Sequence, residues 1–183
     1  LLNAVSTFQG KKLSKKDIAS KSIFIEQNQI KEVVGSQDQI NAAFGGFNHI
    51  NFYAKNKFEV KEIKLNKSRL TEFEDKLMLF HTGYSRLAEA VAKSVIDNIE
   101  VNKKHLIKIN DIVNQSLEIF NNGNLDDIGY LLDETWSQKK QLSKKVSNSF
   151  IQECYDIAKK SGALGGKITG AGGGGFLLLF API

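Results

Sequence analysis

The hydrophobic positions in the first third of the chain predict three helical segments followed by two strands. The helical segments are expected over residues 1–8, 14–30 and 39–44. Gly10 closes the first of them, and the second begins with Ser14 and Asp17, which have the spacing of a short capping box. Apolar and polar residues then alternate with the period of a strand over residues 47–53 and 58–65.

The rest of the chain changes from a short strand to a series of helices and back to a strand. Ser68 can cap a helix that runs to Lys76, and the apolar run 77–80 predicts a compact buried strand. Helices are expected where apolar residues recur every three or four positions, over 87–99, 106–120, 125–142 and 146–160. Residues 176–180 form a continuous apolar run, as in a central strand that is covered on both faces. Strands, then helices, then a returning strand indicate an α+β fold.

The composition is that of a globular protein, and it limits the partners that the chain can have. At 183 residues the chain can form one ordinary domain, or one domain with part of another. Its net charge is +5, but the lysines are scattered among carboxylates without the arginine-rich or aromatic pattern of nucleic-acid binding. No apolar run is long enough to span a bilayer, and no secretion signal opens the chain. We therefore expect no nucleic-acid partner and no membrane partner, and we leave a homodimer open.

The single cysteine and the first residue bear on location and completeness. Cys154 shares a helical spacing with Phe150 and Ile157, which predicts a buried thiol rather than a nucleophile. One cysteine cannot form an internal disulfide, so a cytoplasmic location is expected. The chain starts at a leucine and its only methionine is Met78, which we interpret as the mark of a fragment.

The strongest chemical signal is a glycine-rich segment, residues 165–175, between the last predicted helix and the last predicted strand. Seven of its eleven residues are glycines, which cost backbone entropy on folding and let backbone N–H groups approach a ligand. The spacing differs from that of a Walker A loop, and the strand follows the glycines instead of preceding them as in a dinucleotide site. A ligand-contacting loop is the favoured interpretation, and a structural bend is the alternative.

Two further segments combine polar residues with a predicted helix start. Asp38 lies where a loop carboxylate can accept a proton from an alcohol, although composition alone favours Asp38 or Ser36 as the cap of a helical turn. Residues 81–86 carry hydroxyls and Arg86 at a helix N-terminus, which suits a phosphate or a sugar, with Ser85 as N-cap the alternative. The histidines are isolated from one another and from cysteine, so spacing predicts no metal site. The residues alone favour a small-molecule site without identifying its reaction.

At these segments the chain resembles the GHMP kinases, a superfamily that includes galactokinases, homoserine kinases and mevalonate kinases. Residues 167–175, followed by an apolar strand, are similar to the third signature motif of that family. Residues 35–48 resemble the segment that carries the catalytic aspartate of its sugar kinases. Residues 82–86 and 136–143 add a likeness to the kinases of D-glycero-D-manno-heptose phosphates. The likeness runs through essentially the whole chain, over residues 1–182.

The resemblance implies an ATP- and Mg²⁺-dependent phosphotransferase that acts on a sugar or sugar phosphate. Heptose 7-phosphate is the expected substrate, in surface-polysaccharide precursor synthesis. Asp38 is the implied catalytic base and Glu26 the implied Mg²⁺ ligand, with Asn28 nearby where some relatives carry an acid. The implied substrate-binding residues are Arg86, Lys167, Gly170, Ala171, Gly172, Gly173 and Gly174. We expect the glycine loop to lie within reach of Asp38, because both would face one substrate.

The resemblance also divides the chain into two parts. Residues 1–65 correspond to a remnant of an N-terminal nucleotide-binding domain of ribosomal-S5-like fold, and residues 66–183 to a C-terminal domain of helices on an antiparallel sheet. The family's first motif and its glycine-serine phosphate loop are absent from this sequence, so the fragment itself is expected to be inactive. The alternative is a non-catalytic binding or assembly module on the same scaffold.

Overall fold

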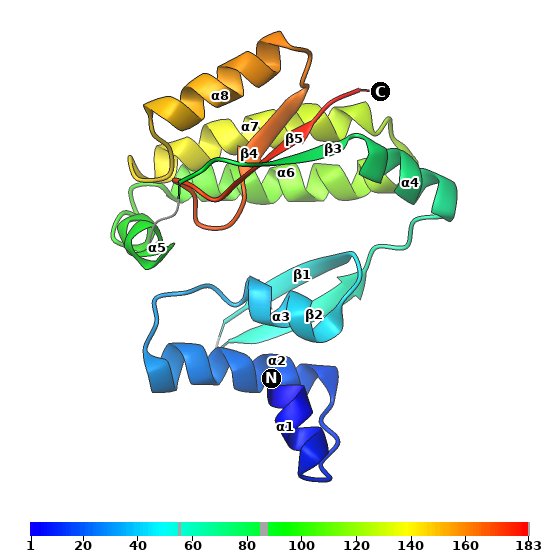
Figure 1. Ribbon diagram of the computed structural model, residues 1–183, viewed down its shortest axis with the longest axis vertical. Coiled ribbons are helices and arrows are strands. Elements are labelled where there is room, and N and C mark those ends of the chain that lie inside the picture. The colour runs from blue at the N-terminus through cyan, green and yellow to red at the C-terminus, as the bar shows by residue number, and fades with distance from the viewer. Residues whose placement is uncertain (55, 85–87, 183) are drawn as a thin grey trace. The chain divides into compact units, whose positions relative to one another are not determined.

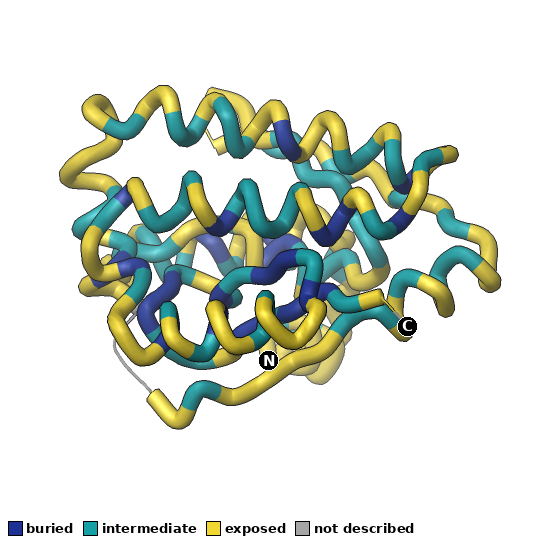
Figure 2. Tube along the Cα trace, turned by 90° about the horizontal axis from the view of Figure 1, so that it is seen from above, coloured by how far each residue is buried: buried dark blue, intermediate teal, exposed yellow. Residues whose placement is uncertain are grey.

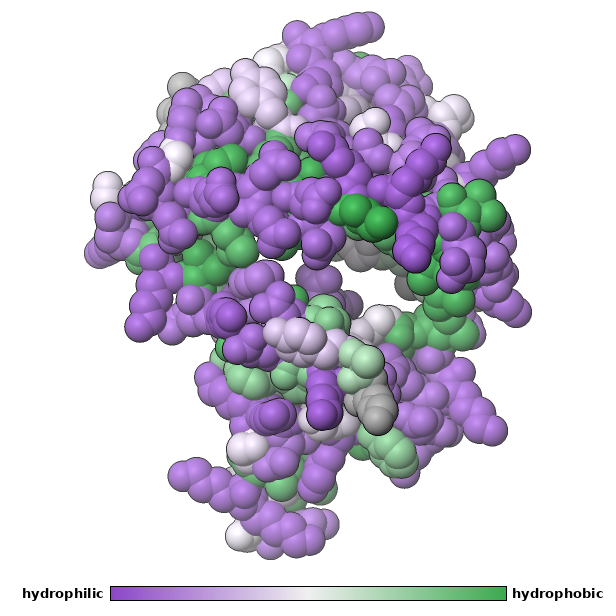
Figure 3. Space-filling model, turned by 180° about the vertical axis from the view of Figure 1, so that it is seen from behind, coloured by the Kyte–Doolittle hydropathy of each residue, from purple (hydrophilic) through white to green (hydrophobic). Residues whose placement is uncertain are grey.

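The computed structural model describes residues 1–54, 56–84 and 88–182, in two compact units, Leu1–Lys64 and Leu65–Ile183. Helices and antiparallel strands occur in both units, so the predicted α+β class is confirmed (Figure 1). The assignment of the first unit to a nucleotide-binding domain stays a prediction. The surface seen in Figure 3 is mostly hydrophilic, with separate apolar patches. Within the described ranges no helix combines the length and apolar character needed to cross a membrane.

The first unit packs helices against a two-stranded antiparallel sheet. Its elements are α1 (Leu2–Phe8), α2 (Lys15–Phe24), the π-helix η1 (Ile25–Ile30), α3 (Gln37–Phe44), β1 (Asn48–Tyr53) and β2 (Lys57–Glu62). Ile50 of β1 lies opposite Val60 of β2, and both side chains pack against a small core. Ala19 and Ile23 of α2 and Ile40 of α3 are buried in that core, which holds α3 against α2.

The predicted helix starts in this unit are confirmed with one change. The Ser14 hydroxyl accepts the Asp17 N–H at 3.1 Å and the Asp17 carboxylate accepts the Ser14 N–H at 3.3 Å, which completes the capping box. The third helix begins at Gln37, earlier than predicted. The helix can include Asp38 in its first turn, because the helix dipole favours negative charge at the N-terminal end.

The second unit is a three-stranded antiparallel sheet with long helices. Its elements are α4 (Lys67–Asp75), β3 (Leu77–His81), α5 (Ala88–Ile96), α6 (Lys103–Asn122), α7 (Asp126–Leu142), α8 (Ser149–Lys160), β4 (Gly165–Ile168) and β5 (Phe176–Phe180). The strand order β3-β5-β4 places the apolar β5 in the centre, as predicted. Helices α6 and α7 run side by side, and α7 packs against β4 (Figure 1). Along the helices exposed positions alternate with intermediate ones and with a few buried ones (Figure 2).

The main core of the second unit joins the sheet to α7 and α8. Its buried residues are Val91, Trp136, Val146, Ile151, Tyr155, Ile168, Leu177 and Leu179. Cys154 packs against this core but is only half-buried, so the prediction of a buried thiol is correct in part. Arg69 of α4 donates to the carbonyl groups of Ile119, Phe120 and Gly123 at the C-terminal end of α6, which ties α4 to that helix.

Three local predictions in this unit are wrong, each for a physical reason. Strand β3 is not buried, with Leu79 57% and Phe80 51% exposed, because it forms the edge of the sheet opposite β4, and α7 packs against β4. Asn66, rather than Ser68, caps α4, and its side-chain oxygen accepts a helix N–H at 2.9 Å. Strand β4 lies in the segment predicted to be a loop, because glycine is a poor strand former and conceals a strand from the hydrophobic pattern.

Candidate functional site

The glycine-rich segment folds into a β-hairpin in which a loop over residues 169–175 joins β4 to β5. Four glycines of this loop have positive φ angles: Gly170 (66°), Gly172 (110°), Gly173 (74°) and Gly175 (86°). Residues with a side chain rarely adopt such angles, so the loop conformation requires glycine at these positions. We call residues 169–175 the hairpin loop.

The first two glycines of the segment have a different role, because they let neighbouring backbone come close. A Cβ atom on Gly165 would lie 2.0 Å from the carbonyl oxygen of Gly129 in α7. A Cβ atom on Gly166 would lie 2.3 Å from the carbonyl oxygen of Leu178 in β5. The structural alternative therefore applies to Gly165 and Gly166, and the candidate ligand loop shortens to the hairpin loop.

The hairpin loop is tied to the polar segment that follows β3. The backbone N–H and the hydroxyl of Thr82 both donate to the Gly175 carbonyl at 2.9 Å. The Gly175 N–H donates to the Tyr84 carbonyl at 2.9 Å. The structure thus brings together two segments that the sequence predicts to be functional. Arg86, the implied substrate ligand of the second segment, and Ser85 lie outside the described residues.

Part of the hairpin loop keeps its backbone donors free. The N–H groups of Gly170, Ala171 and Gly174 make no hydrogen bond to any residue that the structure describes, whereas the Gly173 N–H donates to the Val146 carbonyl at 2.6 Å. Gly170 is exposed and Ala171 and Gly174 are half-buried, so these donors can reach a ligand. Gly172 and Gly173 are buried. Free backbone donors of this kind suit an anion or the hydroxyls of a sugar.

A lysine of the segment 136–143, which resembles the heptose kinases but in which the sequence pattern assigns no single residue a role, supports the hairpin loop. Lys139 of α7 donates from Nζ to the Gly170 carbonyl at 2.5 Å and to the Ile168 carbonyl at 3.4 Å. Lys167 of β4 faces the same helix, because it shares a face of the strand with Gly165, which packs directly on α7. In the sequence Lys139 is one of two adjacent lysines in an amphipathic helix, and no pattern separates it from a solvated residue.

These two side chains, which we call the Lys139–Lys167 pair, place like charges close together. Burial, and secondly the charge of Lys167, lower the pKa of Lys139 from 10.5 to about 8. Burial also lowers the pKa of Lys167. Within the described part of the chain neither lysine has a carboxylate at ion-pair distance. The arrangement therefore suits a negatively charged ligand.

We expect the Lys139 ammonium to titrate near pH 8, as carbon-13 NMR of the lysine side chains can measure. Lys167→Met removes the repulsion and should raise this pKa, but not to 10.5, because desolvation is the larger cause. The exposed Lys160→Met is the control and should not shift it. Between about pH 8 and pH 10.5 the Lys139 side chain is protonated in the unfolded chain but largely deprotonated in the folded one. The free energy of unfolding should therefore rise with pH over this range. A midpoint at the ordinary value would contradict the burial of this ammonium group.

In the first unit, Asp38 is the second residue of α3 and is exposed. It makes no hydrogen bond or ion pair with any residue in the described ranges. Ser36 stands at the N-cap position without a capping hydrogen bond, and its hydroxyl instead accepts the Gln27 side-chain amide at 3.1 Å. The capping alternative is therefore wrong for both residues. Asp38 lies at a helix N-terminus, where negative charge is favoured, and its carboxylate is free to meet a substrate.

Glu26 lies on η1, and its carboxylate accepts a hydrogen bond from the side-chain amide of Gln39, the residue after Asp38. Gln39 is buried, and its own side-chain oxygen has no partner among the described residues. The described residues contain no group of three or more His, Cys, Asp or Glu side chains that could hold a metal. Mg²⁺ in kinases uses one or two carboxylates and completes its shell with water and phosphates, so the half-buried Glu26 fits as a single ligand.

The predicted site residues thus fall into two groups. Glu26 and the start of α3 are brought together in the first unit, and the hairpin loop and Lys167 in the second. Because the two groups belong to different units, the expectation that the hairpin loop lies within reach of Asp38 stays a prediction.

Comparison with known proteins connects these features to a family. The family profile described as GHMP kinases C terminal matches residues 116–182. The D-glycero-alpha-D-manno-heptose 7-phosphate kinase of Campylobacter jejuni is 30% identical over 172 residues, which cover 92% of this chain and 50% of that protein. The L-fucokinase/L-fucose-1-P guanylyltransferase of Bacteroides fragilis is 26% identical, with 99% of this chain and 20% of that protein covered.

A solved structure shares the fold. The D-glycero-D-manno-heptose 1-phosphate kinase from Bacteroides thetaiotaomicron matches with a TM-score of 0.64 and 23% identity, over 98% of this chain and 49% of that one. The chain spans about half the length of the two heptose kinases that it matches. Residues 116–182 therefore match the C-terminal domain of the GHMP kinases, and the resemblance to this family inferred from the motifs of the chain is confirmed.

Proposed function

We propose that the chain supplies the acceptor side of an ATP-dependent kinase that phosphorylates a hydroxyl group of a sugar or sugar phosphate. The observation that carries the proposal is the hairpin loop, whose free backbone donors lie beside two lysines without carboxylate partners in the described structure. Such a loop suits a small ligand that has both hydroxyls and negative charge.

Heptose 7-phosphate is the proposed acceptor, in the cytoplasmic synthesis of surface-polysaccharide precursors. The support for this choice is the 30% identity to the Campylobacter jejuni kinase that is named for that sugar phosphate. A mildly basic chain, with a net charge of +5, also suits an anionic acceptor.

Asp38 is the proposed general base. Its carboxylate takes the proton of the acceptor hydroxyl as the hydroxyl oxygen attacks the γ-phosphorus of ATP, and the bond from that phosphorus to the leaving ADP oxygen breaks. Asp38 is exposed and free of partners among the described residues, so its oxygens are available for this proton. Its place in the first turn of α3 fixes the backbone that carries the carboxylate.

Glu26 is the proposed Mg²⁺ ligand, and Mg²⁺ bound there supplies positive charge to the phosphates of ATP. The Gln39 side-chain amide holds the Glu26 carboxylate in place. Gln39 is buried and directly follows Asp38 in α3, so it couples the position of the proposed base to that of the proposed metal ligand.

The hairpin loop and Lys167 form the proposed acceptor site in the second unit. The N–H groups of Gly170, Ala171 and Gly174 can donate to acceptor oxygens. Gly172 and Gly173 are buried and contribute through their positive φ angles, which shape the loop. Lys167 contributes positive charge. Arg86, outside the described residues, is proposed from the resemblance as a second cation.

The 183-residue chain by itself is expected to show no turnover above background with ATP, Mg²⁺ and heptose 7-phosphate. It spans about half of the Campylobacter jejuni kinase that it matches. Phosphoryl transfer depends on holding ATP and the acceptor in place and on stabilising the charge of the transition state, and we expect this to need residues from both halves of such a kinase. A coupled assay of ADP release measures this. Turnover that Asp38→Asn abolishes would contradict the expected inactivity while supporting Asp38 as the base.

The gene itself separates the kinase from a non-catalytic module. An in-frame glycine-serine phosphate loop encoded upstream of Leu1 supports the kinase. A start codon directly before Leu1 supports a binding or assembly module on the same scaffold, and would contradict the proposed function.

A further inference from the structure

We propose that the Lys139–Lys167 pair receives a phosphate group that the acceptor sugar already carries, so that the hairpin selects sugar phosphates over free sugars. This inference rests on the proposed function, because it assigns the charged part of the same acceptor site. It adds Lys139, on α7, to the residues that the family resemblance implies, and it gives the two lysines one shared ligand.

The geometry brings the two ammonium groups to the start of the hairpin loop from different elements. Lys139 reaches it from α7, and two of its three N–H bonds are directed at the Ile168 and Gly170 carbonyls. Lys167 reaches it from β4, and its ammonium group makes no hydrogen bond or ion pair with any residue that the structure describes. One donor of Lys139 and the donors of Lys167 therefore remain for a ligand.

The other lysines of this unit that are largely covered show that the pair is an exception. Lys76 lies 2.6 Å from Asp126, and Lys159 lies 3.2 Å from Asp133. Lys140 lies over an aromatic ring, 5.7 Å from its centroid, and donates to a glutamine. These lysines are neutralised or satisfied within the unit, as covered charges require. The Lys139–Lys167 pair has no such partner in the described chain, so an anionic ligand is the group that would complete it.

A phosphate monoester fits this position better than a carboxylate or a hydroxyl group. It carries about two negative charges at neutral pH and has three terminal oxygens, which matches two cations and several N–H donors. The N–H groups of Gly170 and Ala171 lie in the same loop that Lys139 holds, and they are free to donate to such an oxygen. A free sugar can accept a hydrogen bond from a lysine but has no charge, so it lacks the charge–charge attraction that a phosphate gains from the two cations.

The test is titration calorimetry of the 183-residue chain with heptose 7-phosphate, with unphosphorylated heptose, and with a non-hydrolysable ATP analogue. Lys167→Met is the main variant, because this side chain makes no hydrogen bond whose loss would disturb the described fold. We expect it to weaken binding of heptose 7-phosphate by about 10-fold, as for the loss of one hydrogen bond to a charged group, and to leave heptose binding unchanged. Lys160→Met, an exposed lysine of α8, is the matched control and should change neither.

The pH dependence of sulfate binding is a second readout that needs no sugar. Sulfate keeps its charge through the neutral and alkaline range, so its affinity should be constant below pH 8 and fall above it as Lys139 loses its proton. The titratable group that faces Lys139 is Lys167, since the hairpin loop contains none and Asp133 is bound by Tyr155 and Lys159. In Lys167→Met the fall should move to higher pH.

The outcomes separate this inference from the proposed function. Equal losses for heptose and heptose 7-phosphate in Lys167→Met, or no binding of either ligand or of sulfate, would overturn the inference. If Lys167→Met weakens binding of the ATP analogue alone, the Lys139–Lys167 pair binds the nucleotide, and this result would overturn the inference as well. If the chain binds heptose 7-phosphate through Lys167 but the complete gene product transfers no phosphoryl group, the inference stands and the proposed function fails.

Discussion

Replacing Asp38 with Asn in the complete gene product is expected to lower kcat by about 10²- to 10⁴-fold, with little change in ATP affinity. The substitution keeps the volume of the side chain but removes the proton acceptor and the negative charge. Asp38 is exposed in the first turn of α3 and has no partner within the described residues, so the substitution removes no internal contact. Steady-state kinetics at saturating ATP measure the effect.

The control for this substitution is Glu32→Gln, which makes the same change of charge at an exposed position before α3. It should leave kcat and the melting temperature unchanged. If Asp38→Asn also melts and turns over normally, Asp38 is only a surface residue of the first helical turn, and the proposed mechanism loses its base.

Gly165→Ala is expected to give the largest loss of stability among single-methyl changes in the hairpin. Its new Cβ would lie 2.0 Å from the Gly129 carbonyl oxygen, which is backbone of α7 and cannot rotate away. Overpacking of this kind costs about 1–3 kcal/mol and occasionally more, and we expect the free energy of unfolding to fall by about 3 kcal/mol or more. Urea denaturation followed by circular dichroism measures it.

Gly170→Ala is the matched variant in the same hairpin. No atom lies within 4 Å of its new Cβ, but its φ of +66° is unfavourable for alanine. The expected loss is therefore only the roughly 1–2 kcal/mol of a left-handed residue. Equal losses for the two variants would show that α7 moves away from β4 easily, and that close packing does not explain Gly165.

The helices and the class of fold could be predicted from the sequence because their signals are local. The capping box at Ser14 is set by residues three positions apart, and the amphipathic helices by apolar residues one turn apart. The hairpin loop was predictable as a special segment because positive φ angles leave a visible mark, a cluster of glycines.

Other features depend on contacts between distant segments, and local pattern does not contain them. The exposure of Phe80 follows from the strand order and from the packing of α7 against β4 at the other edge, and the apolar character of β3 does not reveal either. The role of Gly165 depends on how closely α7 approaches β4. Lys139 and Lys167 are far apart in the chain and become a pair only through that same approach.

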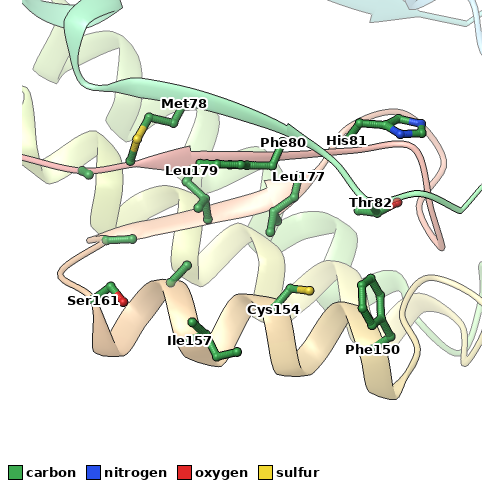
Figure 4. A pocket seen from close by; sticks show the side chains of 13 residues that line it. Met78, Phe80, His81, Thr82, Phe150, Cys154, Ile157, Ser161, Leu177 and Leu179 are labelled. Carbon is green, nitrogen blue, oxygen red and sulfur yellow. The ribbon is translucent and has the colours of Figure 1, made fainter.

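One apolar feature of the second unit borders the candidate site at Thr82, which donates to the Gly175 carbonyl of the hairpin loop. Strand β3 and α8 line an open groove of about 490 Å³ in which Met78, Phe80 and Ile157 are exposed (Figure 4). Exposed apolar side chains on an edge strand favour association with another segment or chain. Variants of the hairpin loop should therefore keep the residues of this groove unchanged, so that a change in association is not mistaken for a change in ligand binding.

Phosphorus-31 NMR of the complete gene product with ATP, Mg²⁺ and heptose 7-phosphate is the measurement that tests the proposed function most directly. We expect a second phosphate ester on the sugar, formed in equal amount to ADP, and a fall of about 10²- to 10⁴-fold in the rate at which both signals grow in Asp38→Asn. A folded protein that forms ADP without a new sugar ester, or that transfers no phosphoryl group to heptose 7-phosphate or to any other sugar or sugar phosphate, would contradict the proposed function.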